Sequence, residues 1–104
     1  MCAVPIIVVT GFRQARGPLL ELLDTAPPLI DAAVRDVAMR VDGVRDLDRC
    51  LVRKVGFSYY VDLHVVVDRD MSVKDGHDVA HRVQRAVRAA IPRVADVLVH
   101  IEPD

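Results

Sequence analysis

The feature that most constrains the fold is an alternating segment in the middle of the chain, Ser58–Asp68. Apolar residues occupy every second position of this segment, and polar residues fill most of the positions between them. Successive side chains of a strand point to opposite faces of a sheet, so the pattern predicts a strand with one buried face. The inward residues would be Tyr59, Val61, Leu63, Val65 and Val67, and the outward ones Tyr60, Asp62, His64, Val66 and Asp68.

The residues before this strand predict a helix and a second strand. After Pro28, apolar residues recur at three- and four-residue spacing up to Val41, which is the pattern of an amphipathic helix. Gly43 is a natural end for that helix. Residues 44–55 favour a strand, and only Gly56 and Phe57 separate it from the alternating segment, which predicts a hairpin.

The residues after the alternating segment predict a second helix and a last strand. Ser72 and Asp75 have the spacing of a capping box, which starts a helix. The apolar stripe of this helix is Val79, Val83, Ala86, Val87, Ala90 and Ile91. Residues 96–102 alternate again, with His100 and Glu102 on the outward side.

The order helix, strand, strand, helix, strand predicts one fold class. Two amphipathic helices on one face of a three-stranded, mostly antiparallel sheet form an α+β open-faced sandwich of the ferredoxin-like kind, αββαβ. A further strand at residues 4–10 would complete the order βαββαβ. In either case, the chain itself leaves the second face of the sheet uncovered.

Composition excludes several classes of function. The 104 residues carry 14 Lys and Arg against 15 Asp and Glu, and the chain has no Trp, two Phe and two Tyr. A near-neutral charge and few aromatic rings disfavour nucleic acid as a partner. The opening apolar stretch is too short to span a bilayer. Two cysteines form no disulfide framework, which favours a reduced, cytoplasmic setting. Neither a glycine-rich phosphate loop nor a nucleophile elbow occurs, so we do not expect an enzyme.

The uncovered face of the sheet carries the residues with chemistry. Alternation places His64, His100 and Glu102 on this face, together with Asp62. In the first strand Asp46, Asp48 and Cys50 share a parity, but an irregular apolar pattern, of the kind a bulge produces, leaves their face undetermined. Imidazoles and carboxylates on neighbouring strands suit zinc and other first-row divalent ions. The alternative is an ordinary solvated sheet face.

Two histidines of the second helix form another candidate. His77 and His81 are four residues apart, so they can chelate one ion or simply be solvated, and His77 can also reach a partner subunit. Cys50 is either a soft ligand or a small buried hydrophobe, and Cys2 is a weaker candidate ligand.

Several segments together resemble the cytosolic C-terminal domain of the cation diffusion facilitator family of metal transporters. The resemblance extends from about Gly11 to Pro103. The segments that carry it are Gly11-Phe12-Arg13, Pro18–Ala26, Val41–Val44, Val61–Val65, Gly76–Ala80 and Val99–Pro103. The strand histidine and the final His-x-Glu-Pro are specific in combination.

This resemblance implies a metallochaperone-like domain that forms a V-shaped homodimer and binds zinc, or a related divalent ion, within and between subunits. Asp48 stands where many relatives have histidine, and His81 matches no family ligand. The matching ligand positions are Asp48, His64, His77, His100 and Glu102.

The resemblance also divides the chain and implies its role. Residues 1–17 resemble the tail of a last transmembrane helix, and residues 18–104 resemble the dimerisation and metal-binding domain. The start at Met1 favours a free-standing protein over an excised domain. We expect a cytoplasmic, zinc-binding homodimer that regulates or supports cation efflux by dimer closure, with a membrane-embedded transporter as partner. The alternatives are a dimerisation module without metal and a small-molecule-sensing regulatory domain.

Overall fold

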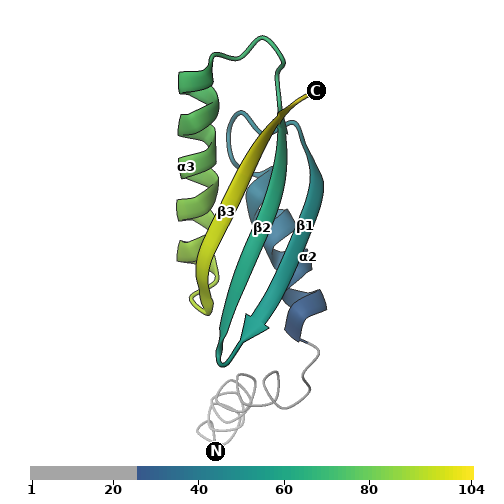
Figure 1. Ribbon diagram of the computed structural model, residues 1–104, viewed down its shortest axis with the longest axis vertical. Coiled ribbons are helices and arrows are strands. Elements are labelled where there is room, and N and C mark those ends of the chain that lie inside the picture. The colour runs from purple at the N-terminus through teal and green to yellow at the C-terminus, as the bar shows by residue number, and fades with distance from the viewer. Residues whose placement is uncertain (1–25) are drawn as a thin grey trace, which may run out of the picture.

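The computed structural model describes residues 26–104, so the predicted strand at 4–10 and the apolar segment 1–17 lie outside the described residues. The described chain forms two helices and three strands in the predicted order (Figure 1). None of the helices in this part of the chain is long and apolar enough to cross a membrane. The elements are α2 (Ala26–Met39), β1 (Asp46–Val55), β2 (Ser58–Val67), α3 (Val73–Ala90) and β3 (Val94–Pro103).

The three strands form one sheet in the order β1-β2-β3. The predicted hairpin is present, because β1 pairs with β2 in antiparallel orientation across Gly56 and Phe57. The strands β2 and β3 pair in parallel, so the sheet is mixed and the expected mostly antiparallel arrangement is corrected. The reason is α3, which returns the chain to the starting end of β2 before β3 begins. Both helices lie on the same side of the sheet (Figure 1).

The core lies between this helical layer and the inward face of the sheet. All five predicted inward residues of β2 are buried, Leu63 and Val65 completely. The helices contribute fewer buried residues than their apolar stripes predict, and Leu29 remains about half exposed at 51%. The buried hydrophobic residues of the other elements are Val34, Ala38, Val79, Val83, Val87, Val94 and Val97.

Local signals position the ends of the elements. The Ser72 hydroxyl accepts a hydrogen bond from the Asp75 backbone N–H at 3.1 Å and caps α3 as predicted. Gly56 has a φ of 61°, as the tight hairpin requires, and Gly43 has a φ of 96° between α2 and β1. The two turns set the positions where β1 begins and ends, and the cap sets the position where α3 begins.

Candidate metal site

A bulge in β1 brings Asp48 to the uncovered face. Leu47 pairs with Val65 and Arg49 pairs with His64, so Asp48 is an extra residue between two regular pairs. Leu47 and Cys50 pack against the core, whereas the Asp48 carboxylate lies near His64 on the opposite face. The bulge therefore separates Asp48 from Cys50, which strict alternation had given the same parity.

The pairing of β2 with β3 brings the remaining donors together. His64 lies beside His100 in the register, and Val66 lies beside Glu102. The imidazole rings of His64 and His100 are stacked, with centroids 4.5 Å apart and an interplanar angle of 23°. The His64 Nδ1 and Glu102 Oε1 atoms are 2.6 Å apart, the distance of a short, charge-assisted hydrogen bond.

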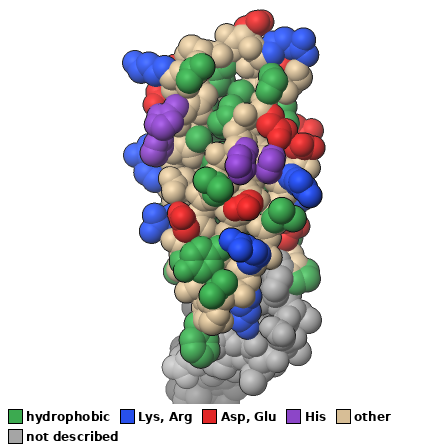
Figure 2. Space-filling view, in the orientation of Figure 1, with side chains coloured by type: hydrophobic (Ala, Val, Ile, Leu, Met, Phe, Trp, Pro, Cys, Tyr) green, Lys and Arg blue, Asp and Glu red, His purple; other side chains and the backbone are tan. Residues whose placement is uncertain are grey.

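Asp48, His64 and Glu102 form the tightest donor group of the described residues. One ligand atom of each residue lies within 4.8 Å of the other two. Asp48 is exposed, and the His64 and Glu102 side chains are 24% and 33% exposed, so solvent ions can reach all three. We call this group the open-face cluster. Figure 2 shows histidine side chains beside acidic ones on this face.

The surroundings of Glu102 favour its ionised form. The hydrogen bond from His64 is the largest influence and lowers the pKa of the Glu102 carboxyl group. A contact with Asp48 and the nearby charges of His64 and His100 lower the pKa of Glu102 further, whereas partial desolvation opposes them. A carboxylate held ionised is ready to bind a cation.

The donor set fits a first-row divalent ion. One imidazole nitrogen and two carboxylate oxygens, with His100 beside them, are the donor types that zinc accepts. Two donors on one tetrahedral ion at Zn–N distances lie about 3.3–3.4 Å apart. The cluster would contract from 4.8 Å, and the 2.6 Å contact between His64 and Glu102 would open to admit an ion.

The other predicted donors lie elsewhere. His77 and His81 lie on α3, in the helical layer, away from the open-face cluster, and Figure 2 shows two separate groups of histidine side chains. The thiol of Cys50 lies on the helical side, where burial and then the Asp31 carboxylate raise its pKa to about 12. A thiol that stays protonated is a poor metal ligand.

An ion-pair network beside the cluster was missed by the sequence analysis. Arg45 pairs with Asp68 at 2.9 Å and also with Asp104, whose carboxylate lies 3.3 Å from the Arg69 guanidinium. The backbone N–H of Asp104 donates to the Val67 carbonyl at 2.9 Å. The network ties the ends of all three strands together close to Asp48 and Glu102. Its members are far apart in sequence, so local patterns carried no signal for it.

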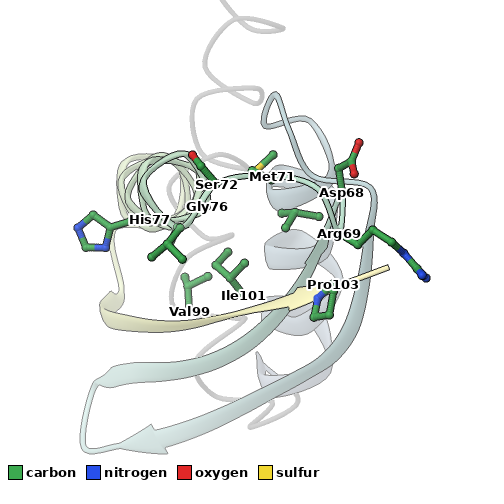
Figure 3. Close-up of a pocket in the computed structure, with 12 residues that line it drawn as sticks. Asp68, Arg69, Met71, Ser72, Gly76, His77, Val99, Ile101 and Pro103 are labelled. Carbon is green, nitrogen blue, oxygen red and sulfur yellow. The ribbon is translucent and has the colours of Figure 1, made fainter.

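A separate apolar cavity of about 420 Å³ lies between α3 and β3. Figure 3 shows Val99 and Ile101 of β3 pointing into it, beside Met71 and the start of α3. The His77 ring points away from this cavity. Its lining is mostly apolar but includes Asp68, Arg69 and Ser72, so it suits an apolar molecule that carries a polar group.

The family model that matches this chain describes cation efflux proteins, and its sequence relatives include metal tolerance proteins. The family described as "Cation efflux protein, cytoplasmic domain" matches residues 26–104. Metal tolerance protein C1 of Arabidopsis thaliana is 35% identical over 99 residues, which are 94% of this chain but only 21% of that protein. The chain thus spans about a fifth of the length of this relative.

Solved structures agree with the sequence relatives. The MamM-CTD 215-293 structure is 28% identical, has a TM-score of 0.73, and covers 74% of this chain and 98% of its own. A second MamM CTD structure, described as the nickel form of a variant with a histidine in place of a glutamate, has the same TM-score of 0.73 at 27% identity. Both are isolated domains of nearly the same extent as the described residues.

Proposed function

Because this chain belongs to the cation efflux family, as the cytoplasmic C-terminal dimerisation domain of a cation diffusion facilitator, we propose that its open-face cluster binds a divalent, zinc-type cation. Binding would close the homodimer and thereby regulate or support cation efflux. Members of this family move ions rather than convert substrates, and we assign the chain no catalytic role. The observation that carries the proposal is the convergence of Asp48, His64 and Glu102 within 4.8 Å.

The mechanism that we propose is electrostatic. Without an ion, the carboxyl groups of Asp48 and Glu102 lie side by side, and within the cluster the positive charge that faces Glu102 comes from His64. A divalent cation would supply the missing positive charge. His64 would then turn its Nδ1 from Glu102 to the ion, and His100, stacked on His64, is placed to follow it.

Dimer closure would come from ligands on a facing subunit. His77 is the one residue of the expected ligand set on α3, so it can reach an open-face cluster only if a partner subunit presents it. An ion shared in this way would favour the arrangement in which two subunits lie close together. The nickel form of a related MamM CTD variant, in which a histidine replaces a glutamate, is consistent with metal binding to this domain type. We propose zinc as the ion and a membrane-embedded cation transporter as the partner.

Calorimetry of metal-free protein with zinc at near-neutral pH tests the proposal, with the size of the dimer measured on the same samples. We expect saturable binding of at least one ion per subunit and a more compact dimer. The double variant His64→Ala, Glu102→Ala should lose this binding. The matched control is Asp62→Ala, which removes a carboxylate from the same face of β2 but outside the cluster.

Other outcomes identify the alternatives. A parent dimer that neither zinc nor a chelator affects would contradict the proposal and favour a dimerisation module without metal. Thermal stabilisation by a small apolar metabolite, with none by zinc, would favour a small-molecule-sensing domain. The apolar cavity beside Ile101 is where such a molecule would bind.

A further inference from the structure

The histidine pair of α3 lies apart from the open-face cluster and has its own geometry. The Nε2 atoms of His77 and His81 are 3.0 Å apart. Their rings meet edge to face, with centroids 4.4 Å apart and an angle of 74° between the planes. Both residues are exposed, one turn apart on a continuous helix. Their converging nitrogens therefore face solvent and are open to a ligand.

We propose that His77 and His81 form a second cation site, which chelates one Cu²⁺ or Ni²⁺ ion within a single subunit. Residues at i and i+4 are neighbours on a helix, and two histidines at this spacing bind one metal ion in other helices. The alternative is a neutral pair in which one ring donates a hydrogen bond to the other. Metal binding distinguishes the two.

The separation of the nitrogens favours these ions over tetrahedral zinc. At metal–nitrogen distances of 2.0–2.1 Å, nitrogens 3.0 Å apart subtend an angle of about 91–97° at the ion. This is the angle between neighbouring positions of a square-planar or octahedral ion, which are the geometries typical of Cu²⁺ and Ni²⁺. Two ligands of a tetrahedral ion would lie about 3.3–3.4 Å apart instead. The spacing of the two nitrogens therefore matches the first class of ion more closely than it matches tetrahedral zinc.

The surroundings leave room for a hydrated ion. His77, His81 and Gln84 border one hollow of about 200 Å³, whose floor is formed by β3 residues 97–99. Gln84 borders the same hollow, and its amide oxygen is a candidate for a third ligand. On the other side of His81, Asp78 offers a carboxylate, and the Arg82 guanidinium donates to the Asp42 carbonyl at 3.1 Å. Water would fill the remaining positions around the ion.

This site shares His77 with the dimer-bridging role proposed above, but it does not need the open-face cluster of its own subunit, because α3 and that cluster lie on different layers of the domain. The test uses nickel chloride and the His64→Ala, Glu102→Ala protein, in which the open-face cluster is disabled. Calorimetry should still show one Ni²⁺ ion bound per subunit. Adding His81→Ala should lower the association constant about tenfold or more, since even outer-shell changes cost metal sites that much.

Control variants show whether a loss of Ni²⁺ binding comes from the His77–His81 pair or from a general effect of substitution in α3. Arg88→Ala, at another exposed position of α3, should leave Ni²⁺ binding unchanged. In the otherwise unaltered protein, His81→Ala should remove one Ni²⁺ equivalent, and Cu²⁺ spectra should change from two coordinated imidazoles to one. The proposal is wrong if the His81→Ala protein binds Ni²⁺ as the parent does. The same result is expected if His77 binds metal only as part of a partner subunit's open-face cluster. Absence of Ni²⁺ binding in the disabled protein would overturn it equally.

Discussion

Gly43 is the position where one added methyl group tests the packing of the helical layer most directly. Its φ of +96° lies in the left-handed region, and an added Cβ would lie 2.8 Å from the Cγ2 atom of Val79. Val79 is 1% exposed in the middle of α3, so it has no free space to move into. Gly56 shares the positive φ, at +61°, but an added Cβ there meets nothing within 4 Å.

The cost of Gly43→Ala follows from these two features. A left-handed backbone costs an L-residue about 1–2 kcal/mol, and this applies to both glycines. Overpacking a filled core costs about 1–3 kcal/mol more, and this applies only to Gly43. We therefore expect Gly43→Ala to lower the free energy of unfolding by about 2–5 kcal/mol, a large part of a typical 5–15 kcal/mol. Gly56→Ala should cost only about 1–2 kcal/mol.

Urea unfolding followed by far-ultraviolet circular dichroism measures both losses. All variants must be compared at one protein concentration, because dimerisation adds to apparent stability. In a double-mutant cycle, Val79→Ala should cost less in the Gly43→Ala background than in the parent, since it removes the methyl group that clashes. Equal losses for Gly43→Ala and Gly56→Ala would refute the assigned contact between Gly43 and Val79.

Three further predictions concern single side chains. The raised pKa of Cys50, about 12, should slow its alkylation at pH 8 about a thousandfold relative to unfolded chain, measured in a Cys2→Ser background. Asp31→Ala should speed this alkylation, because the carboxylate stabilises the thiol form; an unchanged rate would contradict the contact. Ser72→Ala should lower the free energy of unfolding by about 1 kcal/mol, through loss of the helix cap. Because the pKa of Glu102 is lowered on folding, stability should be lost as pH falls through that lowered value. Carboxyl NMR titration should show the Glu102 pKa returning towards its ordinary value in His64→Ala.

Most of the fold was predictable because β2, the central strand of the sheet, has a regular alternation of apolar and polar residues. Its strict alternation matched the buried residues one for one, from Tyr59 to Val67. The parallel pairing of β3 with β2 was missed, although the helix predicted between the two strands is the connection typical of parallel neighbours. Alternation alone fixes which face a residue takes but not which neighbour a strand selects. The role of Ala38 was also missed, since a buried alanine gives little hydropathy signal beside the larger residues of α2.

The positions of the candidate donor residues were predictable where these residues lie on regular strands. His64 and Glu102 follow from alternation, and their contact follows from the direct pairing of β2 with β3. The assignment of His77 came from resemblance, and the structure brings it to His81 instead of the open-face cluster. Its part in a shared site depends on a second subunit, which no pattern within one chain can place.

The bulge at Asp48 shows why sequence alternation cannot settle a donor set by itself. A regular strand would place Asp48 and Cys50 on one face, because their positions differ by two. The extra residue shifts the register by one, so that Leu47 and Cys50 pack inward while the carboxylate between them points outward. The same short segment thus serves the core and the open-face cluster at once. Without the bulge, Asp48 and Cys50 would lie on the same face of β1, and Leu47 would lie on the other. Asp48 could then reach the outward face only if Cys50 left the core. The register of β1 therefore determines the charge available to a cation as well as the packing of the sheet.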